Sequence, residues 1–237
     1  MSRWDALLSL QDHDTTADQL QHRLAHLPSR DELGQVMGEL ARLETTTAEV
    51  EGRRHDLGRG QQRLEDEISA LTDKAGQHDK TLYSGTIGNP RELQALQDEI
   101  AALKRRISQL EDQELELMEQ IEPLDAELAT AAGRRVELDE RGAGLRAQIA
   151  EEEVAIEGEL EQVRKERDQL AADVEADLLA EYADLRKRLG GIAIARLVGG
   201  SCGGCHLSMS AVDVDRIKKL PPDAPAYCEE CGRLLAR

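Results

Sequence analysis

The chain has 237 residues, of which 33% are charged and only 2% are aromatic, and its formal net charge at pH 7 is −18. Bulky side chains are too scarce for a large globular core, whereas the many Ala, Glu, Leu, Arg and Gln residues are typical of long exposed helices. Every apolar run is too short for a membrane span or a signal peptide. We therefore expect a cytoplasmic, mainly α protein.

The negative charge is unevenly distributed along the chain. Residues 190–237 contain six cations and five anions, which gives +1, so the preceding residues carry a net charge of −19. Helices with that charge repel nucleic acid, which confines any such binding to a local patch. The sequence also has no Gly-rich phosphate loop and no nucleophile with a plausible base, so we predict that the protein is not an enzyme and has no small-molecule substrate.

Residues 1–27 have their apolar side chains at helical spacing, which predicts a helix with one apolar face. These side chains are Trp4, Leu7, Leu10, Ala17, Leu20, Leu24 and Leu27. A matching apolar stripe runs through residues 148–172. We expect the two segments to pack against each other.

Between residues 33 and 82, mostly apolar residues follow alternating three- and four-residue steps over about seven heptads. The same spacing resumes over residues 93–149. Two seams in phase, joined by a short loop, predict an antiparallel coiled-coil hairpin in which Leu64 lies opposite Leu110.

The stretch between the seams, residues 83–92, forms the tip of the predicted hairpin. Asn89 is suited to cap a helix and Pro90 to begin one, so these two residues suffice to turn the chain back. Three further side chains are more than a turn requires, so two interpretations are open: a simple turn or an interaction site. They are Tyr83, Ile87 and Arg91.

Both arms of the hairpin are weak at one level. Residues 28–31 contain a proline, which lacks a backbone donor, followed by a serine that is suited to cap a new helix. In the predicted register this break faces residues 142–144, where two glycines lower helix propensity. We predict a joint or kink at this level of a hairpin domain that spans residues 1–189.

Residues 190–237 hold the strongest chemical signal, two C-x-x-C motifs about twenty residues apart, which is the spacing of a zinc site. The predicted ligands are Cys202, Cys205, Cys228 and Cys231. Four thiolates complete a tetrahedron without an open position, so we expect one structural Zn²⁺ and no hydrolytic centre. The alternating segment 192–198, short apolar pairs near the second motif and a short helix capped by Ser210 predict a zinc ribbon.

Two other interpretations of the cysteines are less well supported. A thioredoxin-like redox pair uses a single C-x-x-C motif in a βαβ setting, which this sequence lacks. His206 directly follows Cys205 and has a metal-binding side chain, but four cysteines already saturate the site.

The chain resembles a bacterial family, the C4-type zinc-ribbon coiled-coil proteins, over nearly its whole length. The resemblance rests on residues 88–96 (GNPRELQAL), 198–206 (VGGSCGGCH) and 228–233 (CEECGR). It implies a non-enzymatic adaptor whose relatives are associated with RNA binding or with transcription factors and secretion-apparatus partners. The Glu229-Glu230 pair departs from the Pro-Asn pair frequent in the family, which weakens the case for nucleic acid at that motif.

Two functions are therefore open. The first is a zinc-binding adaptor that docks protein partners through its ribbon, its tip or both. The second is a regulatory protein that binds RNA or DNA through the ribbon and a basic patch at its base. The candidate basic patch consists of Arg186, Lys187, Arg188, Arg196, Lys218 and Lys219. The charge of zinc-bound thiolates and the scarcity of stacking aromatics favour the adaptor.

Overall fold

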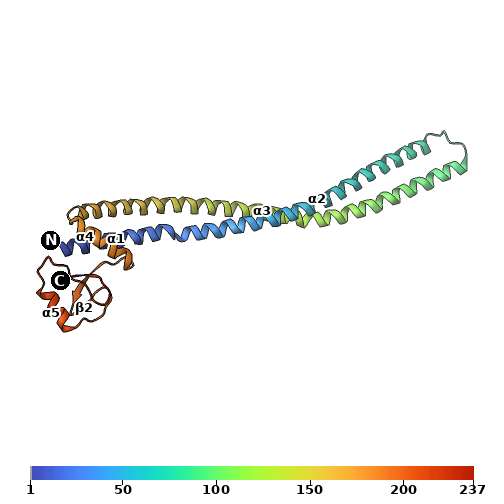
Figure 1. Cartoon of the computed structure of the whole chain (residues 1–237). Coiled ribbons are helices and arrows are strands. Elements are labelled where there is room, and N and C mark those ends of the chain that lie inside the picture. The colour runs from blue at the N-terminus through green and yellow to red at the C-terminus, as the bar shows by residue number, and fades with distance from the viewer. Residues whose placement is uncertain (1) are drawn as a thin grey trace. The chain divides into compact units, whose positions relative to one another are not determined.

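The computed structural model describes residues 2–237 and consists largely of helices (Figure 1). The elements in chain order are α1 (Arg3–Ala25), α2 (Pro28–Tyr83), α3 (Pro90–Ala172), α4 (Ala176–Arg188), β1 (Ile194–Val198), β2 (Ser201–Cys202), α5 (Ala211–Lys219) and β3 (Leu234–Ala236). The predicted fold class is confirmed: a long antiparallel helical hairpin with a small C-terminal ribbon. No helix within residues 2–237 is both long enough and apolar enough to cross a membrane.

The chain divides into two compact units. The hairpin unit is Glu32–Gly144, which contains most of α2, the turn and the first part of α3. The ribbon unit combines the residues up to Asp31 with Leu145–Arg237, so that α1, the end of α3, α4 and the strands belong together. The domain boundary predicted between residues 189 and 190 stays a prediction.

In the hairpin unit, α2 and α3 lie side by side in opposite directions (Figure 1). Their seam buries Val36, Val50, Ala75, Ile100, Leu110, Ile121 and Leu138. An ion pair of 2.9 Å between Arg106 and Glu67 lies within a turn of the predicted Leu64–Leu110 level. Exposed pairs of this kind stabilise little, but they agree with the predicted register.

The turn of the hairpin is built as predicted. α2 ends at Tyr83 and α3 begins at Pro90. Asn89 caps α3, because its Oδ1 accepts a hydrogen bond of 3.0 Å from the backbone N–H of Arg91. Its Nδ2 donates to the Glu92 carboxylate at 3.2 Å, which fixes the capping side chain.

The first arm is interrupted between α1 and α2, whereas α3 continues through residues 142–144. α2 begins with Pro28, because a proline loses nothing at the first position of a helix. The expectation that Ser29 caps this helix is wrong: Ser29 lies inside α2, and its hydroxyl donates to Glu152 at 2.9 Å. The joint at this level stays a prediction.

The packing of α1 against the end of α3 is confirmed by a buried cluster of Leu20, Leu27, Ile156 and Leu160. A second break was not predicted: α3 ends at Ala172, and α4 is a separate helix. A second buried cluster joins α1, α4 and two strands. It contains Trp4, Leu7, Leu10, Leu178, Tyr182, Leu185, Ala193, Ile194, Leu234 and Ala236. The ribbon therefore shares a core with the helices.

The three strands form one sheet in the order β2-β1-β3, with β1 antiparallel to β2 and parallel to β3. Alternate residues of β3 face different sides, since Leu234 belongs to the cluster with the helices and Leu235 to a cluster around the cysteines. Ser210 caps α5 as predicted, with its hydroxyl accepting from the Asp213 N–H at 3.1 Å. The sheet thus places the cysteines on the side away from α1.

Candidate metal centre

The four predicted ligands come together in the ribbon. Their Sγ atoms all lie within 4.8 Å of one another, with Cys202 4.0 Å from Cys231 and Cys205 3.8 Å from Cys228. A tetrahedral Zn²⁺ with Zn–S bonds of about 2.3 Å places its sulfurs about 3.8 Å apart. The cluster therefore fits one structural zinc ion with no open position.

Two turns of the same backbone design carry the cysteines, and we call them knuckles. In the first, the N–H of His206 donates to the carbonyl of Cys202 at 2.8 Å, and in the second the N–H of Gly232 donates to the carbonyl of Cys228 at 2.8 Å. The fifth residue of each knuckle is left-handed, with φ of 62° at His206 and 72° at Gly232. Each knuckle thereby turns both of its thiols toward the other.

Close packing explains the two glycines of the first knuckle. A Cβ on Gly203 would lie 3.0 Å from the carbonyl oxygen of Arg196. A Cβ on Gly204 would lie 2.6 Å from Cδ of Arg233 and 3.1 Å from Cβ of Ala195. Larger residues would push the knuckle away from the sheet and separate its thiols from those of the second knuckle.

The protein environment acts differently on the individual thiols. Burial raises the pKa of the Cys228 thiol to about 12. Burial also opposes ionisation of Cys231, but hydrogen bonds from Arg233 outweigh it and lower the pKa of that thiol to about 7. Because zinc binds thiolates, metal binding must release the proton of Cys228.

His206 is not a member of the cluster, which within residues 2–237 contains only the four cysteines. Its side chain is exposed at the end of the first knuckle. The first knuckle therefore offers its two cysteines, and not its histidine, to the ion.

Gln11 of α1 holds the ribbon to the helices, and it was missed in the sequence. Its Oε1 accepts hydrogen bonds from the N–H groups of Ala193 at 2.7 Å and Ile194 at 2.9 Å, and its Nε2 donates to the carbonyl of Ile194 at 2.9 Å. Gln11 is 8% exposed. The sequence did contain a signal for a buried polar contact, because Gln11 lies seven positions after Trp4 and therefore on the apolar face of the helix.

The last residue fastens the loop that follows α5. The Arg237 guanidinium donates to five carbonyl groups, those of Ile217, Leu220, Pro221, Pro222 and Ala224. The indole N–H of Trp4 donates to the carbonyl of Pro222 at 2.8 Å. The apolar spacing of residues 1–27 predicted a core role for Trp4, but this contact with the ribbon could not be derived from it.

The candidate basic patch is largely neutralised within the ribbon unit. Four of its six cations have carboxylate partners: Arg186 with Asp14 and Asp18, Arg188 with Asp184, Arg196 with Asp5 and Lys219 with Asp215. In the part of the chain from residue 2 to residue 237, Lys187 and Lys218 form no ion pair. Asp5 and Asp18 lie about 20 Å apart along α1, which separates Arg196 from Arg186.

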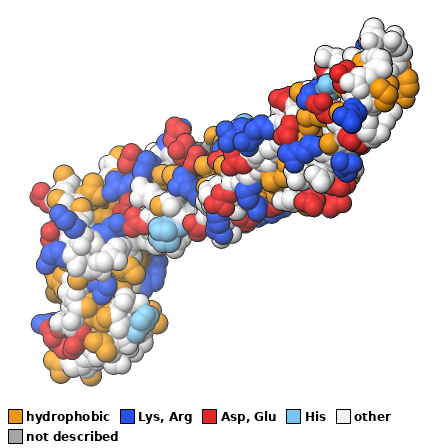
Figure 2. All heavy atoms as spheres, turned by 90° about the vertical axis from the view of Figure 1, so that its right-hand side faces the viewer, with side chains coloured by type: hydrophobic (Ala, Val, Ile, Leu, Met, Phe, Trp, Pro, Cys, Tyr) orange, Lys and Arg blue, Asp and Glu red, His pale blue; other side chains and the backbone are white. Residues whose placement is uncertain are grey.

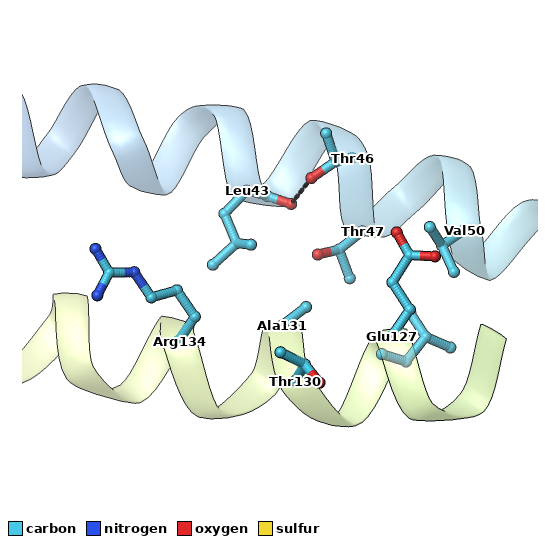
Figure 3. A pocket seen from close by; sticks show the side chains of 9 residues that line it. Leu43, Thr46, Thr47, Val50, Glu127, Thr130, Ala131 and Arg134 are labelled. Carbon is cyan, nitrogen blue, oxygen red and sulfur yellow. Dashed lines mark hydrogen bonds between the residues drawn. The ribbon is translucent and has the colours of Figure 1, made fainter. Parts of the chain in front are cut away.

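The candidate tip residues lie at the surface of the turn. Tyr83 is 84% exposed, Arg91 is exposed and Ile87 is half-buried. The hairpin unit also has a surface hollow of about 330 Å³ between α2 and α3 (Figure 3). Small side chains such as Thr47 and Ala131 leave this space, and its two charged residues are Glu127 and Arg134. Arg134 is paired with Glu39 at 3.0 Å.

The fold and the cysteine cluster define a class of protein: a coiled-coil hairpin that carries a C4-type zinc ribbon. Residues 10–190 match the family described as the CT398-like coiled coil hairpin domain, and residues 201–235 match the C4-type zinc ribbon domain. Because the first match covers most of the chain, the protein belongs to the CT398-like coiled-coil hairpin family. This confirms the resemblance found in the sequence.

Several known proteins are similar over nearly their whole length. The uncharacterized protein Rv2229c of Mycobacterium tuberculosis is 31% identical over 239 residues, covering 98% of this chain and 94% of the relative. A solved structure from Mycobacterium smegmatis has a TM-score of 0.84 at 24% identity and covers 100% of both chains. CT398 from Chlamydia trachomatis has a TM-score of 0.64 at 20% identity over 98% of both chains. These structures show a shared fold.

Proposed function

We propose that the protein is a cytoplasmic, non-enzymatic adaptor that docks protein partners through its hairpin tip, its ribbon or both. The observation that carries the proposal is the tip: among the large apolar side chains of residues 2–237, Tyr83 has the greatest exposed fraction, 84%. The reversal of the chain needs only Asn89 and Pro90. An aromatic side chain left in water at a tip suits protein contact.

The ribbon supplies a second candidate docking surface, which we call the ribbon face. It consists of Val198, Leu207 and Val212, which are 63%, 51% and 77% exposed. Val198 lies in β1, Leu207 follows the first knuckle and Val212 lies in the first turn of α5. On the face drawn in Figure 2, hydrophobic side chains (orange) lie at the surface between acidic (red) and basic (blue) ones. The closed zinc site supports an interaction role, because a site saturated by four cysteines positions backbone and performs no hydrolysis.

Partner capture tests the adaptor role. Tagged, zinc-loaded protein is used to capture partners from the source bacterium, as wild type, as a Tyr83→Ala/Ile87→Ala/Arg91→Ala variant and as a Val198→Ser/Leu207→Ser/Val212→Ser variant. Val154→Ala, at another exposed valine, is the control. At least one docking variant should lose a partner that the control retains, confirmed by titration with that purified partner. Identical partners in all four samples would contradict the proposal. Partners in transcription or secretion are those that the family resemblance implies.

Nucleic-acid binding is tested separately. We expect no salt-dependent binding to single-stranded RNA or duplex DNA, because most of the candidate basic patch is paired with carboxylates. A titration at two salt concentrations compares wild type with a variant carrying alanine at Arg186, Lys187, Arg188, Lys218 and Lys219. Binding that weakens with salt and is lost in the variant would support the second function instead.

A further inference from the structure

α3 has a second stripe, apolar except at Glu122, on the face opposite its seam. The seam of this part of α3 includes Leu117, Ile121 and Leu124, and at about 100° per residue a stripe offset by two positions lies on the other side of the helix. We call it the outer stripe, and it consists of Leu115, Met118, Glu122, Ala126, Ala129, Gly133 and Val136. The steps between its members are three or four residues throughout, which is the spacing of a helix-packing surface.

Nothing in the hairpin unit covers the outer stripe. Leu115 is 57% exposed, Met118 47% and Val136 57%, and these are large apolar side chains to leave in water on one helix. A Cβ added at Gly133 would meet no atom within 4 Å, so the surface there is open. The small residues between the large ones allow a second backbone to approach closely.

The stripe is complementary to itself when one copy is reversed. Pairing about a twofold axis between Asp125 and Ala126 places six of the seven stripe residues opposite another stripe residue, and Ala126 lies beside the axis, opposite Asp125. Leu115 then meets Val136, and Met118 meets the open space over Gly133, so that large side chains face smaller ones. Isologous contacts of this kind are the commonest in homo-oligomers.

Charge also favours the reversed orientation. Glu116 falls opposite Arg135, whose side chain is 60% exposed although it also pairs with Glu44 at 3.5 Å and Asp139 at 3.7 Å. A parallel pairing would instead place Arg135 against its own copy and Glu122 against its own copy, which repel. Beyond the stripe, Asp112 falls opposite Asp139, so the contact ends near Leu115 and Val136 and spans about 32 Å.

We propose that the outer stripe binds the outer stripe of a second copy of this chain in antiparallel orientation, giving a weak homodimer. The occupant is a second copy because spacing, side-chain size and charge all match on reversal of the same segment. The surface lies wholly within the hairpin unit and is separate from the tip and the ribbon face, so this inference does not depend on the adaptor role.

Sedimentation of the full, zinc-loaded chain from low to high micromolar concentration tests the dimer. Wild type should associate, and Met118→Glu or Val136→Glu should weaken association at least about tenfold by burying a charge. Val154→Glu is the control and should not weaken association, because Val154 lies on the same helix, is 71% exposed and is outside the stripe. Circular dichroism checks that each variant stays helical. A wild type that is monomeric throughout, or a dimer unchanged by both stripe variants, would overturn the proposal.

Crosslinking tests the orientation. A short bismaleimide should join copies of Ala126→Cys, because residue 126 lies beside the proposed axis. It should not join copies of Leu115→Cys, whose positions lie about 31 Å apart in an antiparallel pair. Wild type gives the background from the zinc-binding cysteines. Crosslinking of Leu115→Cys as efficient as that of Ala126→Cys would indicate a parallel pair and overturn the proposal.

Discussion

His206 and Gly232 occupy the same left-handed position in the two knuckles, but only one of them is suited to it. Glycine adopts positive φ without a steric penalty, whereas a residue with a Cβ is strained there by about 1 kcal/mol. The hydrogen bond from the N–H of His206 to Cys202 holds the strained conformation. The first knuckle is therefore the less stable of the two as a piece of backbone.

The substitution His206→Gly should stabilise the ribbon by about 1 kcal/mol, because it removes the strain of the left-handed position. The measurement is the rate at which zinc passes to a chromogenic chelator, which should fall. His206→Ala is the matched control: it removes the imidazole but keeps the Cβ, so its rate should match that of wild type. Faster zinc loss from His206→Gly would show that the imidazole itself supports the site.

Zinc affinity should fall as the pH falls. The Cys228 thiol, whose pKa burial raises to about 12, is protonated at neutral pH in the metal-free protein and becomes a thiolate in the complex. The deprotonated form is therefore stabilised by the metal, and that stabilisation is lost on acidification. Competition with a chelator of known pH dependence should show affinity weakening by at least about tenfold per pH unit between about pH 8 and pH 6. A pH-independent affinity would contradict proton release.

At the scale of elements, the junction between α1 and β1 depends on one buried amide. The side-chain oxygen of Gln11 accepts hydrogen bonds from the N–H groups of both Ala193 and Ile194. Its partners lie at the start of β1 and directly before it, and both belong to the cluster that the ribbon shares with the helices. The junction is thus a polar contact inside an apolar cluster, where an unsatisfied group is expensive.

Gln11→Leu should destabilise the junction by about 2–4 kcal/mol, because it leaves buried N–H groups without acceptors. Hydrogen exchange at Ala193 and Ile194 should accelerate, while the hairpin unit keeps its protection. Gln120→Leu, at an exposed position of α3, is the control. It should change neither the stability of the junction nor the exchange at Ala193 and Ile194. Unaltered exchange at Ala193 in Gln11→Leu would mean that the apolar cluster alone holds β1 in place.

Local patterns in the sequence explain which elements could be predicted. The heptads of both arms, the cap at Asn89, the cysteine spacing and the cap at Ser210 each depend on residues close together in the chain. The break before α4 could not be found this way, since residues 173–175 contain neither glycine nor proline. β2 spans two residues, too few for a periodic signal. Gln11 and Arg237 act across long sequence separations, which only the folded chain reveals.

At the scale of the whole molecule, the two units rely on different sources of stability. The hairpin unit buries apolar side chains along the seam between α2 and α3, so we expect its folding to be independent of metal. The buried cluster around the cysteines has six residues, and two of them are the ligands Cys202 and Cys228. Without the ion, this part of the ribbon therefore has only a small core. Binding of zinc should therefore supply much of the folding free energy of the ribbon.

Metal content and hydrogen exchange on the same sample test this dependence most directly. We predict one zinc ion per chain after free metal is removed. Chelation should abolish the protection of β1, β2 and β3 while the amides of α2 and α3 in the hairpin unit remain protected. A metal-free protein whose ribbon amides stay protected would contradict the account.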